Sequence, residues 1–223
     1  MIRKETLEFL KLLRKNNDRR WFAANRSLYD DAWRNVSDMA AFLIAGIRSF
    51  DDTIGPLGPN DCIFRLNRDT RFTPDKTPYK TNFGITIKRD GRRTPGAGYY
   101  LHIEPGSCMM SGGIYMPTAK ELSAIRDAVA KDPKTMRGFL AEPKLAEEFG
   151  HLWGDAVKTA PRGYPKDHPA IDLIRHKHYI VSREISDEEM TDPSFPDSCL
   201  ESFRLVRDFN RYLNAVMDQH PAG

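Results

Sequence analysis

One short segment, residues 65–80, holds most of the side chains in this sequence whose types and spacing could bind or transform a ligand. It reads RLNRDTRFTPDKTPYK, with three arginines at steps of three, two lysines, two aspartates and a tyrosine. A guanidinium group is a planar fork of donors that matches a carboxylate or a phosphate, and several such groups repel one another unless anions neutralise them. Two aspartates are too few for five cations. The segment therefore predicts an anion-binding site, most naturally for phosphate.

The predicted site residues fall into two groups, acidic residues that could be catalytic and basic or hydroxyl-bearing residues that could bind the ligand. Asp69 and Asp75 are the candidate catalytic residues, which would either position the arginines or act as acid and base. A phosphate-bearing small molecule is the expected partner, and the protein would either bind it or act on it as an enzyme. No particular cofactor is indicated. The candidate ligand-binding residues are Arg65, Arg68, Arg71, Lys76, Tyr79 and Lys80.

A divalent metal held by Asp69, Asp75 and Glu104 is an alternative reading of the same carboxylates. We prefer the reading in which the two aspartates orient the arginines, because no cluster of carboxylates with the spacing of metal ligands is visible. No metal ligand is predicted.

The positive charge of the chain is concentrated around this segment. Residues 65–93 contain nine basic and three acidic side chains, a net charge of +6, whereas the whole chain has a net charge of only +3. The positive field is therefore local. A second hypothesis follows, a nucleic-acid-binding module that adds Lys88, Arg89, Arg92 and Arg93 to the segment. A third is a non-catalytic protein-interaction domain in which the segment is a structural lattice of salt bridges.

The spacing RxxRDxRFxxDKxxY at residues 65–79 resembles the signature of a widespread bacterial family, also found within larger fungal proteins and known as a domain of unknown function. The opening of the chain, with Asn17, Trp21, Phe22 and Tyr29, is similar to that family as well. The resemblance thus covers nearly the whole chain. It implies membership and brings no activity, substrate or catalytic residue with it.

Two pairs of side chains elsewhere could supply acid–base or ligand chemistry: His102 with Glu104, and His176 with His178. The members of each pair are two positions apart and would share one face of a strand. Because this spacing is common by chance, both pairs rank below the basic segment. The sequence shows no glycine-rich phosphate loop before a helix, no serine elbow and no Cys-x-x-Cys pair.

The basic segment must be positioned by strands on either side of it. Apolar residues alternate over 62–66 and 83–87, and further strands are expected over 99–103, 108–116 and around 179–181. Short connections between the first four predict antiparallel neighbours. A rigid loop that leaves one strand and enters the next would gather its side chains over the end of the sheet.

Helices are expected at both ends of the chain. One covers about residues 4–14, a cap at Asp18 begins a long second helix that runs to Ile47, and a long closing helix follows Pro196. A capping box at Thr118 begins another helix. The predicted fold is α+β, an antiparallel sheet of about five or six strands packed by the long N- and C-terminal helices.

The bulk properties fit a single α+β domain over residues 1–223, since that length can bury one core. With 40% hydrophobic and 29% charged residues the chain should fold throughout. No run approaches the roughly 18 apolar residues that a membrane span requires, so no membrane partner is expected. A charged start without a leader-like apolar stretch, and three widely spaced cysteines, predict a cytoplasmic protein with reduced thiols.

Overall fold

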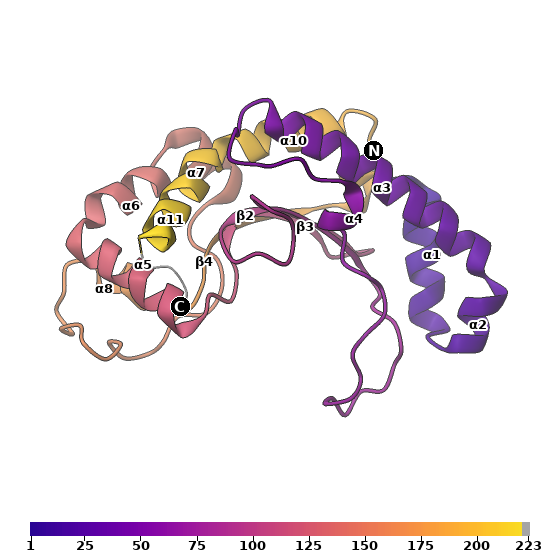
Figure 1. The fold of residues 1–223 in the computed structure, drawn as a ribbon, viewed down its shortest axis with the longest axis horizontal. Coiled ribbons are helices and arrows are strands. Elements are labelled where there is room, and N and C mark those ends of the chain that lie inside the picture. The colour runs from indigo at the N-terminus through magenta and orange to yellow at the C-terminus, as the bar shows by residue number, and fades with distance from the viewer. Residues whose placement is uncertain (220–223) are drawn as a thin grey trace. The chain divides into compact units, whose positions relative to one another are not determined.

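The computed structural model of the protein describes residues 1–219, which form a mixture of helices and one sheet (Figure 1). The strands are β1 (Phe83–Ile87), β2 (Gly98–Ile103), β3 (Cys108–Ile114) and β4 (Tyr179–Ile185). The helices are α1 (Lys4–Lys15), α2 (Arg19–Ala24), α3 (Arg26–Arg48), α4 (Pro59–Cys62), α5 (Ala119–Lys131), α6 (Pro133–Leu140), α7 (Pro143–Phe149), α8 (Ile171–Ile174), α9 (Asp187–Met190), α10 (Phe195–Leu205) and α11 (Arg207–Asp218).

The sheet is open and antiparallel, with its four strands in the order β1-β2-β3-β4. The mixed helix and strand composition agrees with the prediction, but five or six strands are not confirmed. The segment 62–66 forms no strand, because Cys62 ends α4 and the residues after it pair only through isolated bridges, Ile63 with Ile85 and Asn67 with Tyr79. Pro78 also lacks the N–H that a continuous ladder would need.

The first helices follow the sequence pattern with one break. In α1, Leu7, Phe9, Leu10 and Leu13 are buried, as the stripe predicts. The Asp18 carboxylate caps α2 by accepting hydrogen bonds from the backbone N–H groups of the next turn. The prediction of a single long helix from Asp18 to Ile47 is wrong, because the structure has two helices, α2 and α3.

The break lies at Asn25, which ends α2 and begins α3. Its side-chain Nδ2 donates to the carbonyl of Trp21 at 2.9 Å, which satisfies that carbonyl at the end of α2. The closing helix is likewise divided, into α10 and α11 at Val206. The capping box of α5 is confirmed, since Thr118 and Glu121 bond to each other's backbone N–H.

The chain divides into two compact units. Unit 1 comprises Met1–Arg93, Tyr100–Met110 and Glu184–Glu201. Unit 2 comprises Thr94–Tyr99, Ser111–Arg183 and the described residues from Ser202 onward. The single domain expected over residues 1–223 includes four residues outside the described chain and stays a prediction.

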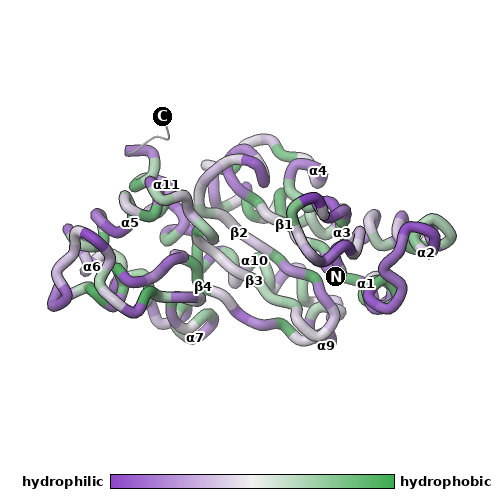
Figure 2. Tube along the Cα trace, turned by 90° about the horizontal axis from the view of Figure 1, so that it is seen from below, coloured by the Kyte–Doolittle hydropathy of each residue, from purple (hydrophilic) through white to green (hydrophobic). Residues whose placement is uncertain are grey.

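In unit 1, helices pack on one face of β1 and β2. The helices α3 and α10 lie side by side above the strands in Figure 1, and a Cβ on Gly46 would lie only 2.3 Å from the Leu200 side chain. Phe83 and Leu101 are buried beneath them. Side chains on the opposite face, such as Tyr100 and His102, are only partly buried. Figure 2 views β1 and β2 from that second face.

The cysteines Cys62, Cys108 and Cys199 are buried and form no disulfide bond. Burial raises the pKa of the Cys62 and Cys108 thiols to about 11, so both stay protonated at neutral pH. No helix within residues 1–219 has the length and apolar character needed to cross a membrane.

Candidate functional site

Residues 65–80 form a long hairpin whose arms meet the sheet at the beginning of β1 (Figure 1). Few backbone bonds hold the arms together: the Arg68 N–H donates to the Pro78 carbonyl at 2.9 Å, and the Lys80 N–H donates to the Leu66 carbonyl at 2.8 Å. We call this segment the basic hairpin.

Asn17, in the turn between α1 and α2, anchors the basic hairpin. Its side-chain amide donates to the Tyr79 carbonyl at 2.9 Å and accepts from the Tyr79 N–H at 3.1 Å. The Tyr79 ring stacks on Phe22 with 4.2 Å between centroids, and the residue is only 9% exposed. Tyr79 therefore fixes the hairpin to the N-terminal helices, a positioning role that was not predicted for it.

Arg68 is held by an aspartate of the same hairpin. Its Nη1 donates to the Asp75 carboxylate and to the Thr77 hydroxyl. The hydrogen bonds from Arg68 and Thr77 lower the pKa of Asp75 to about 2, so Asp75 stays ionised and is a weak base at neutral pH. Among residues 1–219, Nε and Nη2 of Arg68 have no hydrogen-bond partner.

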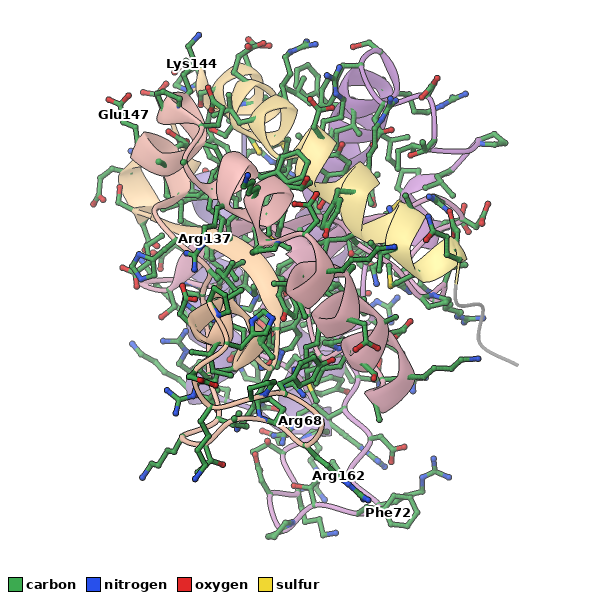
Figure 3. All side chains as sticks on the ribbon, turned by 90° about the vertical axis from the view of Figure 1, so that its left-hand side faces the viewer. Arg68, Phe72, Arg137, Lys144, Glu147 and Arg162 are labelled. Carbon is green, nitrogen blue, oxygen red and sulfur yellow. The ribbon has the colours of Figure 1, made fainter. Side chains whose placement is uncertain are left out.

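The tip of the basic hairpin carries a second such pair. The Arg71 guanidinium donates two hydrogen bonds to the Asp69 carboxylate, from Nε to Oδ1 at 3.0 Å and from Nη2 to Oδ2 at 2.7 Å. Beside it the Phe72 ring is 90% exposed and 5.5 Å from the guanidinium carbon of Arg71. Figure 3 shows Phe72 standing out from the end of the hairpin, beyond Arg68.

A polar cleft of about 340 Å³ lies between the basic hairpin and the α1–α2 turn. It contains three cations, Arg19, Arg68 and Lys76, and Lys76 donates to the Thr70 carbonyl at 2.8 Å. Arg71 does not line it. The lining residues are Asn17, Asp18, Arg19, Asn67, Arg68, Thr70, Lys76, Pro78 and Tyr79.

Two further cations of the basic hairpin lie outside any salt bridge of residues 1–219, although Arg65 is attracted electrostatically to Asp69. Within the described residues Arg65 forms no hydrogen bond or ion pair, and the Lys80 ammonium lies 5.4 Å from the centroid of the Phe64 ring. Burial, followed by repulsion from Arg65 and Arg68, lowers the pKa of Lys80. The hairpin therefore brings Arg65 and Arg68 close enough to Lys80 to repel its ammonium group.

A second polar cluster lies on the partly buried face of β2. The Tyr100 hydroxyl is 2.8 Å from His102 Nδ1, and His102 Nε2 is 3.1 Å from Glu104 Oε2. The other Glu104 oxygen accepts from Thr81 at 2.9 Å and from Arg14 at 3.1 Å. We call Tyr100, His102 and Glu104 the β2 cluster.

Glu104 is held as a carboxylate by this cluster. Burial alone would raise the pKa of Glu104, but the hydrogen bonds from His102 and Thr81 outweigh it and lower that pKa. Glu104 thus has partners other than Asp69 and Asp75, which hold Arg71 and Arg68. In the described chain no three His, Cys, Asp or Glu side chains are grouped to hold a metal ion.

The basic residues after β1 form a group of their own. Residues 88–93 follow the last residue of β1, whereas the basic hairpin enters at its first. Arg92 donates to the Asn60 carbonyl next to α4. Lys80 and Lys88 are eight positions apart, about 25 Å along an extended chain. The basic residues of 65–80 and 88–93 are close in sequence, but they lie at opposite ends of β1, so their positive charge is divided between two places.

The pair His176 and His178 does not lie on one strand face, because β4 begins after it at Tyr179. The His178 ring stacks on Tyr115 with 4.8 Å between centroids and accepts from the Met116 N–H at 3.1 Å. Burial lowers the pKa of both histidines, so they are neutral at pH 7.

Comparison with known proteins adds a family and nothing more specific. The family model described as conserved hypothetical protein (DUF2461) matches residues 5–212, which include the basic hairpin and the β2 cluster. No curated protein and no solved structure matches the chain.

Proposed function

The chain belongs to the conserved hypothetical protein family DUF2461, and we propose that it binds a phosphate-bearing small molecule on its basic hairpin. Arg68 would be the central anion ligand, through the Nε and Nη2 donors that Asp75 does not occupy. Lys76 lines the adjoining cleft, and Arg65 and Lys80 would complete the cationic surroundings. Asp75 and Asp69 are assigned to positioning the guanidinium groups.

The gathering of cations around Lys80, whose ammonium Arg65 and Arg68 repel, is the observation that carries the proposal. A structural lattice would pair each cation with an acid, yet within the described residues Arg65 forms no hydrogen bond or salt bridge and is only attracted electrostatically to Asp69, and the Lys80 ammonium contacts only an aromatic ring. Like charges held together raise the free energy of the empty site, and a bound anion relieves that repulsion. The cleft volume of about 340 Å³ is within the range of small-ligand pockets.

The proposal is tested by titrating the full chain with inorganic pyrophosphate in a calorimeter. We expect binding by the wild-type protein and a loss of about tenfold or more in affinity for Arg68→Gln, because a hydrogen bond to a charged group contributes about 1.5–3 kcal/mol. Arg137→Gln is the matched control, since Arg137 also grips an aspartate, Asp172, but lies in unit 2 (Figure 3). Equal affinities of both variants and the wild type would refute the assignment.

A second candidate function, binding of single-stranded nucleic acid, is favoured by the exposed Phe72 ring beside Arg71. Exposed aromatics next to cations stack bases while the cations contact phosphates. The test is oligonucleotide binding at several salt concentrations. The affinity should fall steeply with salt, and Phe72→Ala should bind the oligonucleotide more weakly. Weak dependence on salt, or no effect of Phe72→Ala, would remove this candidate.

A further inference from the structure

The β2 cluster is a connected chain of hydrogen bonds that the anion site does not use. Tyr100 and His102 stand at alternate positions of β2 and Glu104 follows directly after its last residue, so the three side chains succeed one another at two-residue steps. The hydroxyl, the imidazole and the carboxylate are joined at 2.8 Å and 3.1 Å. Both distances lie within the normal range of hydrogen bonds.

The direction of each hydrogen bond follows from which of these groups can donate a proton and which can only accept one. Glu104 as a carboxylate can only accept, so His102 Nε2 carries the proton that it receives. Nδ1 of a neutral His102 is then an acceptor, and it receives the Tyr100 O–H and, at 3.3 Å, the Asn82 side-chain amide. Thr81 and Arg14 fix the far oxygen of Glu104. Hydroxyl, imidazole and carboxylate in this order activate the hydroxyl of nucleophile–base–acid triads.

We propose that the β2 cluster is a proton-transfer site in which Tyr100 is the group that meets the substrate. The Tyr100 O–H bond breaks as His102 Nδ1 takes its proton, and Glu104 stabilises the resulting imidazolium. The phenolate oxygen then takes a proton from a hydroxyl or an acidic C–H of the substrate. The substrate is left as an anion, both protons are held by the protein, and no oxidant or reductant is required.

Gly84 of β1 packs closely against the Tyr100 hydroxyl, where any larger residue would collide with it. A Cβ on Gly84 would lie 2.9 Å from the Tyr100 hydroxyl oxygen and 3.1 Å from Cδ2 of Phe64. The hydroxyl thus lies over β1 next to the Phe64 ring, and the Lys80 ammonium lies over the same ring. The Phe64 ring therefore lies near both the Lys80 ammonium and the Tyr100 hydroxyl.

Because Lys80 and Tyr100 both lie near the Phe64 ring, we infer that the substrate is a small molecule with two features. It carries a phosphate that binds the basic hairpin and an ionisable proton that Tyr100 removes. The class rests on the proposed function, whereas the reactivity of Tyr100 does not. The two parts can therefore be tested separately on the full chain.

The reactivity of Tyr100 is tested with an arylsulfonyl fluoride, which forms a sulfonate ester with a phenolate oxygen and releases fluoride. The matched control is Tyr115, which is 60% exposed and stacks on His178 but forms no hydrogen bond to that ring. By peptide mass spectrometry we expect Tyr100 to be labelled roughly tenfold faster or more than Tyr115, because an adjacent general base activates it. His102→Gln should reduce Tyr100 labelling to the Tyr115 rate, and His178→Gln should not change it.

Glu104→Gln gives a second readout if His102→Gln disturbs folding. Nitrogen NMR of the wild-type protein should place the His102 proton on Nε2, and this preference should weaken in Glu104→Gln. Labelling of Tyr100 no faster than that of Tyr115 overturns the proton-transfer site, whatever the basic hairpin binds. Fast labelling that inorganic pyrophosphate fails to slow leaves the site intact and overturns the phosphorylated substrate class.

Discussion

Lys80 is a residue at which the proposed ligand binding and the stability of the fold would oppose each other. Burial and the charges of Arg65 and Arg68 lower its pKa in the folded state, so protonated Lys80 destabilises the fold. This penalty is present at neutral pH and fades as the pH rises through the lowered pKa.

We therefore expect Lys80→Gln to raise the free energy of unfolding at pH 7, by an amount within about 1 kcal/mol, and to weaken pyrophosphate binding. Urea unfolding with and without pyrophosphate measures both effects. Lys144→Gln, an exposed lysine in α7, is the control and should change neither. A Lys80→Gln protein that is clearly less stable would instead favour the structural salt-bridge lattice.

Asp75 accepts a hydrogen bond from Nη1 of Arg68 and offsets its charge, so it would compete with the proposed anion. Asp75→Asn keeps an oxygen for the Thr77 N–H but removes the negative charge, so we expect pyrophosphate to bind several-fold more tightly. Calorimetry compares it with the wild type. Binding that is lost in Asp75→Asn would mean that the carboxylate itself takes part in the site, as the sequence-based catalytic assignment holds.

Gly84 leaves room for the Tyr100 hydroxyl. Gly84→Ala should displace the phenol, lower the stability by about 1–3 kcal/mol as overpacking does, and slow the labelling of Tyr100. Gly138→Ala in α6 is the opposite case, because nothing lies within 4 Å of the added Cβ, and it should be neutral or stabilising. Thermal unfolding of the two variants separates these outcomes, and a Gly84→Ala protein with normal stability and labelling would refute the packing argument.

At the scale of elements, the position of the basic hairpin depends on Asn17. Removal of its two hydrogen bonds to the Tyr79 backbone should cost about 1–3 kcal/mol, because both bonds are partly buried. In Asn17→Ala we expect faster hydrogen exchange of the hairpin amides and weaker anion binding. Asn16→Ala, which removes an exposed bond to the Leu12 carbonyl, is the matched control. Equal exchange rates in the two variants would show that the anchor is elsewhere.

The elements also differ in how well the sequence could predict them. The stripe of α1, the Asp18 cap and the Thr118 capping box are local patterns, and each is confirmed. The break at Asn25 was missed because its neighbours continue an amphipathic stripe across it. A strand at 62–66 was predicted from alternation alone, whereas the structure leaves most of its backbone without a ladder partner.

The same reasoning explains the candidate site. The spacing of the arginines in sequence predicted a candidate site on a rigid loop but not its hairpin form, and the pairing of Arg68 with Asp75 depends on the turn between them. His102 and Glu104 were noticed, and the same two-residue spacing leads back to Tyr100. What the sequence does not contain is the register of β1 and β2, which brings Asn82 and Gly84 beside them.

At the scale of the whole molecule, the basic hairpin and the β2 cluster both belong to unit 1. The family match runs through both units, and the net charge of +3 is too small to attract polyanions by itself. Recognition of an anion must then come from local donors, which favours a small ligand over a long nucleic acid. The basic residues beyond β1 follow the end of that strand opposite to the one at which the hairpin enters.

The most direct test of the account is a crystal structure of the full chain grown in phosphate. We predict a phosphate ion at hydrogen-bond distance, about 2.7–3.0 Å, from Nε or Nη2 of Arg68, with Lys76, Arg65 or Lys80 as a second ligand. A basic hairpin in which every cation is occupied by an acid of the protein, with phosphate bound elsewhere or not at all, would contradict it.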